Sequence, residues 1–405
     1  MSTQPPSSTP PPPAPIAAGT QTYTCPQCAS KMSFDAKSGL LACPSCGHKM
    51  PVPSATDAVQ EHDLMQALQN TVGKSTGYGT EMKSINCQNC GATTNVQPNV
   101  TSTTCPFCGS NQIIEQKPDP NMIQPESVVP FAVDESRANM LFRTWLSKGF
   151  FQPGDLKQLG GGQKLRGVYL PFWTFDAHAE SDWWAESGTY YYETEWVTVT
   201  RDGKTVREQR QVQKTRWWPS SGHHADNYDD VLVYATKSID VRILQKVYPY
   251  DTAKLLNYKP EFLSGWAAES YQINLADGWN IGKGNINSEE YSKSDRQVPG
   301  DTHRNLRVNT SLSNLTYKHV LLPVWVASYR YNSKTFQFMI NGQNGKVQGD
   351  KPISWIKVAI VVVIVLAIIG AIVYFVARSK SEGSSSTGEL LMWQQYVMAH
   401  VNMLL

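Results

Sequence analysis

A run of twenty apolar residues near the C-terminal end, Val358–Ala377, is the strongest constraint on how this chain folds. It contains no charged residue and no Asn, Gln, Ser or Thr. At 1.5 Å per residue a helix of this length covers about 30 Å, which is the hydrocarbon thickness of a bilayer. A buried core helix is the alternative, but core helices seldom stay apolar on every face for about five turns. We therefore predict one transmembrane helix over residues 355–378.

The residues around this run fit a membrane interface but do not decide its orientation. Trp355 and Tyr374 lie where interfacial aromatic residues are common, and Lys357 precedes the run while Arg378 and Lys380 follow it. The first twenty residues are rich in Pro, Ser and Thr, so we expect them to be disordered. They also lack the basic start and apolar run of a signal peptide. We therefore expect the bulk of the chain before the span to be cytoplasmic.

All eight cysteines lie before residue 109, in four Cys-x-x-Cys pairs. Fourteen residues separate the two pairs of each set, and the second set follows the first at an offset of 62 residues, which indicates an internal duplication. Four thiolates satisfy tetrahedral Zn²⁺ completely and leave no open position for catalysis. The spacing predicts two structural zinc sites, whose ligands are Cys25, Cys28, Cys43, Cys46, Cys87, Cys90, Cys105 and Cys108.

Two other interpretations of these cysteines compete with zinc. Iron would make each site rubredoxin-like, although nothing nearby in the sequence indicates a redox partner. Disulfides are the second alternative, but duplicated Cys-x-x-Cys pairs at this spacing suit a metal better. Thiolate zinc sites belong in a reducing compartment, which also favours the cytosol. Glycines follow three of the four pairs and are expected to adopt positive φ: Gly47, Gly91 and Gly109.

The charge of the predicted ribbons favours a protein partner over nucleic acid. Residues 21–116 contain five lysines, no arginine and six acidic residues, whereas a nucleic-acid ribbon normally shows a basic face. Between the ribbons, residues 54–68 predict a linker helix with Leu64, Met65 and Leu68 on its apolar face. His62 is expected to be solvated and not to bind metal, because both sites already have four cysteines.

A β-rich domain is predicted after a Pro-rich joint. Asp134 is expected to cap a helix that runs through Lys148. Strands follow: residues 190–200 and 205–218 flank an Arg-Asp-Gly-Lys turn and predict a hairpin. A second hairpin is predicted from residues 327–331 and 335–341.

Two short motifs recur in this domain. Val168–Trp173 (VYLPFW) recurs as Val320–Trp325 (VLLPVW), and Trp184–Ser187 (WAES) resembles Trp266–Ser270 (WAAES). Proline in an apolar strand requires an edge or a bulge. Recurrence at matched places therefore suggests two related β units.

The same domain shows no convincing catalytic constellation. The best ligand-like cluster is His223-His224-Ala-Asp226 with Asp229 and Asp230, which we expect to be a solvated loop after Trp218-Pro219. Glu186 and Glu269 are candidate paired carboxylates that duplication explains equally well. All eight cysteines are assigned to metal, so none remains as a nucleophile.

Several segments resemble one bacterial family of membrane-anchored proteins with TFIIB-type zinc ribbons. The segments are the paired Cys-Pro-x-Cys ribbons, Val129–Val133, Gly167–Asp176, Leu321–Tyr331 and Asn341–Gly345. Members are often mislabelled as primosomal helicases, but the chain has no Gly-Lys-Ser/Thr nucleotide loop. The resemblance implies a scaffold in a membrane-stress system, acting with flotillin-like (SPFH) and PspA-type proteins.

The sequence thus predicts a multidomain, non-enzymatic, single-pass membrane scaffold that docks cytoplasmic partner proteins. A membrane-tethered regulator that binds nucleic acid is the alternative. After the span we expect a linker and an amphipathic tail that lies on the bilayer or packs against a partner. The predicted order is a disordered start (1–20), zinc ribbon 1 (21–52), the linker helix (53–82), zinc ribbon 2 (83–116), the β-rich α+β domain (125–350), the span (355–378) and the tail (379–405).

Overall fold

The computed structural model describes residues 23–52, 59–69, 83–96, 105–108, 110–116, 122–156, 165–201, 204–332 and 334–382. It divides into two compact units, one formed by residues 1–145 with 159–350 and the other by residues 146–158 with 351–405. The predicted disordered start, most of the linker segment 53–82, Gly109 and the tail from residue 383 lie outside the described residues.

Two sheets build the first unit. The smaller sheet has three strands in the order β1-β2-β3, at Ser33–Asp35, Leu40–Ala42 and Lys49–Met50. The larger sheet joins twelve of the described strands, with the main order β11-β8-β13-β9-β12-β6-β5-β7. Its strands are β4 (His62–Asp63), β5 (Lys83–Cys87), β6 (Thr93–Val96), β7 (Ile113–Gln116), β8 (Ser127–Val128), β9 (Arg166–Arg201), β10 (Lys204–Tyr234), β11 (Leu256–Asn257), β12 (Ala267–Glu269), β13 (Thr302–Tyr331), β14 (Lys334–Asn341) and β15 (Val347–Gly349).

The described helices are few. The first unit holds α1 (Leu64–Gln69), α4 (Val241–Val247), α5 (Leu275–Gln297) and the short 3₁₀ turns η1 (Thr252–Lys254) and η2 (Pro260–Leu263). The helix α2 (Glu135–Ser147) crosses the boundary, and α6 (Trp355–Glu382) belongs to the second unit.

The centre of the large sheet is the antiparallel pair β9–β13, which brings the recurring motifs together. Val168 lies opposite Val324 and Leu170 lies opposite Leu322. Leu170 and Leu322 hold the same place in the two motifs, so a local two-fold axis passes through this pair. The flanking strands follow the same symmetry, because β12 runs parallel to β9 and β8 runs parallel to β13. Two related β units would give this arrangement, although the duplication itself stays a prediction.

We predicted that the prolines of the two motifs lie at an edge or a bulge, and this prediction is wrong: both pair within the β9–β13 ladder. Ala235 N donates to Pro171 O and Gly342 N donates to Pro323 O, so each proline directs its backbone away from the β9–β13 ladder. Pro171 lies where the neighbour of β9 changes from β12 to β10, and Pro323 lies where the neighbour of β13 changes from β8 to β14. The missing N–H therefore falls at a gap between strands and costs no ladder hydrogen bond.

The two Trp-Ala motifs, by contrast, occupy unrelated settings. Trp184 lies within the long β9–β10 hairpin and is 52% exposed. Trp266 precedes β12, and its ring stacks on Phe131 with 4.0 Å between centroids. Their similarity does not follow the two-fold axis of the sheet.

Both predicted hairpins are confirmed. Strands β9 and β10 pair from Lys204–Arg201 to Tyr234–Phe172, and β14 pairs with β13 across Asn332, whose φ is 46°. The β9–β10 hairpin is far longer than we predicted, because Trp218-Pro219 does not end β10. Pro219 pairs opposite Glu186 on a strand whose other edge meets no described strand, a position where proline is tolerated.

The linker helix is shorter than predicted. His62–Asp63 form β4 and pair with β13, and α1 begins only at Leu64. Leu64 is fully buried but Met65 is exposed. Asp63 Oδ1 accepts a hydrogen bond of 2.6 Å from Gln66 N, so the helix is capped where the strand ends.

The helix that follows the Pro-rich joint agrees with its predicted cap. Arg137 N donates to Asp134 Oδ1 at 2.8 Å, and α2 ends at Ser147, one residue before the predicted end. Phe142 is buried and stacks on Phe338 of β14 at 3.8 Å between centroids. This contact attaches α2 to the sheet.

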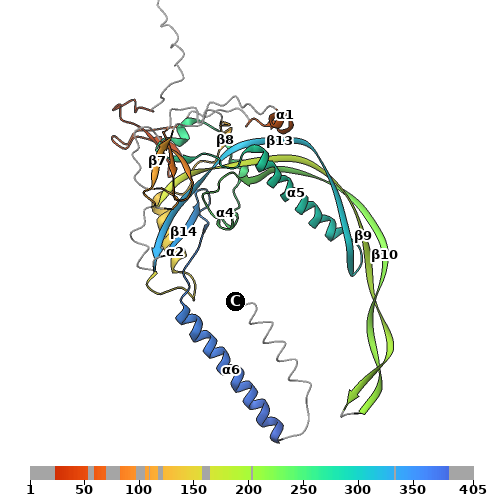
Figure 1. Ribbon diagram of the computed structural model, residues 1–405. Coiled ribbons are helices and arrows are strands. Elements are labelled where there is room, and N and C mark those ends of the chain that lie inside the picture. The colour runs from red at the N-terminus through yellow and green to blue at the C-terminus, as the bar shows by residue number, and fades with distance from the viewer. Residues whose placement is uncertain are drawn as a thin grey trace, which may run out of the picture. The chain divides into compact units, whose positions relative to one another are not determined.

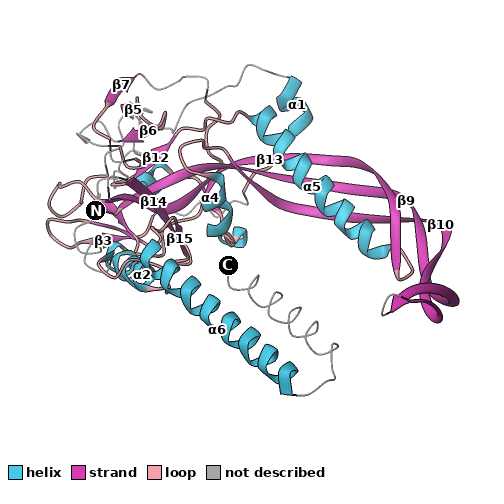
Figure 2. Cartoon of the chain, turned by 60° about the horizontal axis from the view of Figure 1, so that its bottom comes forward, coloured by secondary structure: helices cyan, strands magenta, loops and turns pink. Residues whose placement is uncertain are grey.

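The helix α5 was not predicted, and it lies along the long strands (Figures 1 and 2). Asn274 caps it by accepting a hydrogen bond of 2.8 Å from Asp277 N. Its buried stripe, spaced three and four residues apart, is Leu275, Gly278, Trp279, Gly282, Ile286, Glu290 and Ser294. Glycines let the helix approach Trp173 and Phe175 of β9 closely.

In the second unit, α6 contains a 24-residue segment, Trp355–Arg378, that is long and apolar enough to cross a membrane. None of it is buried within the protein. Residues 146–158 contact its start: Lys357 Nζ donates to the carbonyl oxygens of Phe150 and Gln152, at 3.2 and 2.8 Å. These bonds hold the cation at the end of the apolar segment.

Gly278 and Gly284 of α5 form a matched pair for testing this packing. A Cβ at Gly278 would lie 2.5 Å from the buried ring of Trp173, so Gly278→Ala should lower the free energy of unfolding by about 1–3 kcal/mol. Gly284 has nothing within 4 Å of its Cβ position, so Gly284→Ala should raise the free energy by about 0.5–1 kcal/mol. Denaturant unfolding of the detergent-solubilised chain measures both, and equal effects would contradict the contact.

Candidate metal centres

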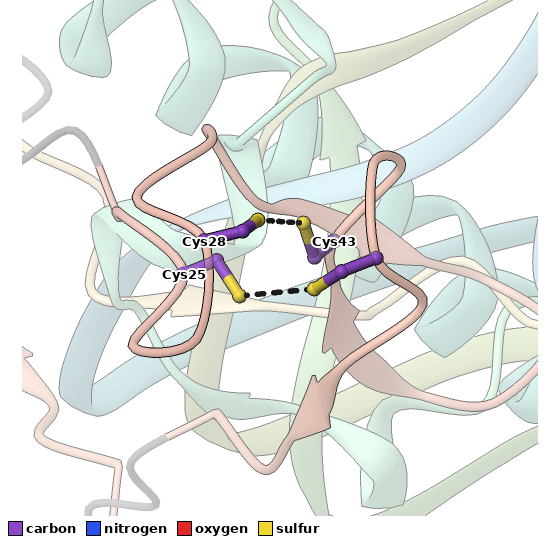
Figure 3. A group of neighbouring side chains, drawn as sticks. Cys25, Cys28 and Cys43 are labelled. Carbon is purple, nitrogen blue, oxygen red and sulfur yellow. Dashed lines mark hydrogen bonds between the residues drawn. The ribbon is translucent and has the colours of Figure 1, made fainter.

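The first Cys-x-x-Cys set forms a compact group of four sulfur atoms. Cys25 Sγ lies 3.4 Å from Cys46 Sγ, and Cys28 Sγ lies 3.4 Å from Cys43 Sγ. Figure 3 shows Cys28 facing Cys43, with Cys25 beside them. A zinc tetrahedron with 2.3 Å bonds has S···S edges of about 3.8 Å, whereas a disulfide requires about 2.05 Å. The group is therefore placed to hold a metal ion.

The second set has the same arrangement. Cys87 Sγ lies 3.6 Å from Cys108 Sγ, and Cys90 Sγ lies 3.7 Å from Cys105 Sγ. All ligand atoms of each group lie within 4.8 Å of one another, and all eight cysteines are free of disulfides. The eight predicted ligands therefore assemble in the two predicted sets of four.

The backbone of each pair folds in one way at all four places. The N–H of the first cysteine donates to the carbonyl five residues later, at 2.7–2.9 Å: Cys25 to Ser30, Cys43 to His48, Cys87 to Ala92 and Cys105 to Ser110. Gly47 and Gly91 have the predicted positive φ, 75° in each. Ala29 takes the equivalent place in the first pair at φ 57°. Hydrogen bonds from Ser30 lower the pKa of Cys28 to about 6. By contrast, although a hydrogen bond from the His48 backbone lowers the pKa of Cys46, its hydrogen bond with Cys25 and its burial raise that pKa overall, so the thiols of this group do not ionise alike.

The two groups differ in their exposure. The first cysteine of every pair is buried, but Cys28 and Cys46 of the first group are exposed, whereas the matching Cys90 and Cys108 of the second group are half-buried. In the second group Cys87 and Cys105 are buried in a hydrophobic core that also contains Val168 and Val324 of the central strands. The first group thus opens to solvent, whereas the second group forms part of the core of the β domain.

The strands of the second ribbon belong to the large sheet. Its strand β6 pairs with β12, so β5, β6 and β7 continue the large sheet. Two polar contacts strengthen this junction: Asn95 Nδ2 donates to Ser270 Oγ at 2.6 Å, and Gln272 Nε2 donates to Gly91 O at 3.1 Å. A metal ion held by this group would therefore be coupled to the edge of the main sheet.

The first ribbon keeps its own sheet but docks on the β domain. Phe34 N donates to Ser264 O at 3.0 Å, and Trp266 Nε1 donates to Phe34 O at 3.0 Å. The rings of Phe34 and Phe262 meet edge to face at 5.5 Å. These contacts fix the orientation of the ribbon and leave its cysteine pairs at the surface.

The histidine-aspartate cluster is in a strand and not in the loop that we predicted. His224 and Asp226 belong to β10, which pairs with β9 throughout this region. They meet the buried Glu290 of α5, which no sequence pattern had indicated as a partner. His224 Nδ1 lies 2.9 Å from Asp226 Oδ2 and 3.4 Å from Glu290 Oε2.

A lysine at the centre of this cluster explains it as an ion-pair network. Lys293 Nζ lies 2.9 Å from Asp226 Oδ1 and 3.4 Å from Glu290 Oε1. Its ammonium lowers the pKa of Asp226. The ammonium thus supplies the positive charge that a metal would bring. Tyr228 and Ser181 complete the network by donating to Glu290, each at 2.6 Å.

Ser294, His224 and Asp226 also lie in the order of a catalytic triad. Ser294 Oγ lies 3.0 Å from His224 Nε2. However, Ser294 is fully buried, and its hydroxyl donates to Glu290 O at 2.9 Å. The hydroxyl therefore joins α5 to β10 and is not presented to a substrate.

The remaining acidic group is arranged in the same way. Asp176, Asp229 and Asp230 gather at a bulge of β10, where Asp230 has φ 53°. Lys318 Nζ lies 2.8 Å from Asp230 Oδ1 and 3.0 Å from Glu61 Oε1. Both acidic clusters thus contain a buried or half-buried lysine, while neither cysteine group contains a cation.

His62 and Glu186 are held in surface ion pairs. His62 Nε2 lies 3.2 Å from Glu126 Oε1. Glu186 pairs with Arg304, whereas Glu269 is buried on β12, so the two candidate carboxylates are not together. A cavity of about 370 Å³ beside Cys87 and Cys105 is lined mainly by apolar residues, with Glu135 and Arg166 as its charged groups.

The chain is similar to the uncharacterized protein YdjG of Bacillus subtilis (strain 168), with 29% identity over 338 residues. The alignment covers 83% of this chain and 92% of the relative. No family model matches the chain, and no solved structure matches it. The function must therefore be inferred from the geometry of the site.

Glu269 generates a pH prediction. Burial raises its pKa from 4.5 to about 8, so the folded protein holds a proton that the unfolded chain releases above pH 4.5. The contribution of Glu269 to the free energy of unfolding should therefore fall as pH rises from about 4.5 to 8, by about 1.4 kcal/mol per pH unit. Glu269→Gln should remove this component. Urea unfolding of both proteins across this range tests it, and parallel pH profiles would contradict it.

Lys293 tests the ion-pair interpretation. Lys293→Met leaves Glu290 buried without its cation, so we expect a loss of about 2–4 kcal/mol in the free energy of unfolding. Adding Glu290→Gln should recover much of that loss. Lys283→Met, on an exposed part of α5, is the control and should change stability by less than about 0.5 kcal/mol. Rescue of Lys293→Met by added Zn²⁺ would identify a metal site instead.

Proposed function

We propose that the protein is a membrane-anchored, non-enzymatic scaffold that holds two structural Zn²⁺ ions and docks partner proteins in the cytoplasm. The observation that carries this proposal is the pair of closed four-cysteine groups built onto one β-rich unit. The chain also has an apolar helix that is unburied within the protein.

The donor set supports zinc as the resident metal. Each group offers four sulfur atoms near tetrahedral spacing with no cation among them, which is the ligand set of structural zinc sites. Four thiolates leave no position for water or substrate, so the metal would fix the fold of each ribbon. Thiolates in this number also favour a reducing compartment, in agreement with a cytoplasmic location.

The first ribbon is the better docking surface of the two. Its residues between paired cysteines, Pro26, Gln27, Pro44 and Ser45, are all exposed. Lys49 pairs with Asp35 at 3.4 Å, so the charges of this ribbon partly neutralise each other. Such a surface favours a protein partner over a phosphate backbone. The second ribbon, which is part of the core, holds the sheet together.

The apolar segment supports membrane anchoring. Leaving some twenty apolar residues in water is unfavourable, and no surface within the protein covers Trp355–Arg378. A bilayer provides the missing apolar environment. The family resemblance adds flotillin-like and PspA-type proteins as the first candidate partners.

The test combines metal analysis with affinity purification of the full chain from detergent-solubilised membranes. We expect two zinc ions per chain, one for each four-cysteine group. The double substitution Cys28→Ser with Cys46→Ser should remove one ion and the co-purifying proteins, while the β domain stays folded because its core does not contain these residues. Cys87→Ser is the contrasting variant and should destabilise the β domain itself.

Three results would overturn the proposal. Iron in place of zinc would indicate electron transfer. Co-purifying proteins that are unchanged in the Cys28→Ser, Cys46→Ser variant would exclude docking by the first ribbon. Retention on DNA that falls steeply with salt would identify nucleic acid as the partner.

A further inference from the structure

The β9–β10 hairpin continues beyond its supporting elements as an isolated two-stranded arm (Figures 1 and 2). The first residue of β13, Thr302, pairs with Gly188, so β9 has no third-strand partner among the described residues after that point. We define the distal arm as residues 189–201 and 204–216, which pair with each other throughout. Its thirteen residue pairs extend about 40 Å.

Residues that pair across an antiparallel ribbon point to the same face, which separates the distal arm into two different faces. We call the even positions 190–200 with the odd positions 205–215 the aromatic face. It contains Tyr190, Tyr192 and Trp196, and Arg207 is its only charged residue. Apart from Arg207 and Trp196, this face consists of threonine, glutamine and the two tyrosines.

The opposite face of the distal arm holds the other charges of its strands. Lys214 Nζ lies 2.6 Å from Glu193 Oε2 and 2.5 Å from Glu195 Oε1. Arg216 lies over the ring of Tyr191 at 5.4 Å. Charged side chains of the opposite face are therefore paired with one another or with Tyr191.

The aromatic face, by contrast, is open. Tyr192 is 63% exposed and Trp196 is 65% exposed, and every position of this face from 192 to 200 and from 205 to 213 is exposed. Large aromatic side chains in water on a ribbon of threonine and glutamine leave apolar surface uncovered. A partner that accepts both ring surface and hydroxyl or indole N–H groups would satisfy them.

Charge selects the kind of partner. Residues 189–216 contain six basic and four acidic residues, a net charge of +2. A second copy of the arm would meet the same positive charge, whereas an anionic bilayer surface attracts it. Tyrosine and tryptophan are also the residues that settle at the headgroup level of membranes, because one end of each ring system is apolar and the other is polar.

We propose that the aromatic face of the distal arm binds the headgroup region of an anionic lipid bilayer, with Tyr190, Tyr192 and Trp196 inserted among the headgroups. The arm gives the protein a second membrane contact besides its apolar helix. This inference rests on the proposed membrane anchoring, because tethering by the helix raises the effective concentration of the surface that the arm binds.

The test uses the full chain reconstituted into vesicles of phosphatidylcholine with phosphatidylglycerol that also contain a photoactivatable phospholipid. After illumination, mass spectrometry measures the lipid-labelled fraction of three peptides: the distal arm, α6 as the positive reference, and α5 as the reference for background. We expect label on the arm well above that on α5. Label on the arm should decrease in vesicles of phosphatidylcholine alone.

Each of two matched double variants changes side chains on one face of the distal arm, the first on the aromatic face and the second on the opposite face. Tyr192→Ser with Trp196→Ser should lower the arm label by about fivefold or more while label on α6 is unchanged. Val197→Ser with Val199→Ser, on the opposite face of the same strand, should retain the label. Circular dichroism of all proteins establishes that the arm variants remain folded.

The outcomes distinguish lipid binding by the distal arm from membrane anchoring by α6. Label on α6 with only background label on the arm overturns the inference and leaves the anchor intact. Background label on both overturns both proposals. Arm peptides that cross-link to a second chain and carry no lipid would show self-association in place of lipid binding. Equal loss of label in the two double variants would show that the aromatic face has no special role.

Discussion

The antiparallel pairing of β9 with β13 is the interaction on which the rest of the first unit depends. It places Leu170 opposite Leu322 at the centre of the sheet and supplies parallel docking edges for β12 on one side and β8 on the other. Through β12 it also carries the second cysteine ribbon. The same pairing extends along the hairpin to Gly188, with two register shifts on the way, so one ladder connects the end of the unit that holds the second cysteine group to the base of the distal arm.

The features that sequence predicted well have local causes. The cysteine pairs assemble because a Cys-x-x-Cys turn is closed by its own backbone hydrogen bonds, which recur at all four places. The apolar helix and the cap at Asp134 likewise depend on residues adjacent in the chain. Such patterns can be recognised without knowing what the segment packs against.

The features that sequence reasoning missed depend on distant partners. The helix α5 buries Gly278, Gly282, Glu290 and Ser294, so its inner stripe is not an apolar stripe and periodicity does not reveal it. Two signals could have predicted this helix: Asn274 as its cap, and the helical spacing of Leu275, Trp279 and Ile286. The His224 cluster looked like a polar loop because the strand that pairs with it lies about forty residues earlier. The second ribbon appeared separate because β12, its partner, comes more than 150 residues later. A charged network and a metal site have similar compositions, and only the position of Lys293 separates them.

The unequal attachment of the two ribbons determines where the chain can be shortened. The first ribbon closes its three-stranded sheet by itself and meets the β domain through a few side chains and backbone bonds near Ser264. Cutting after it leaves every strand of the large sheet with its neighbours. Deleting residues 83–116 instead bares the flank of β12 and opens the core that surrounds Val168. A fragment that starts near residue 59 therefore keeps every strand of the large sheet, because its N-terminal boundary precedes both β4 and the second ribbon.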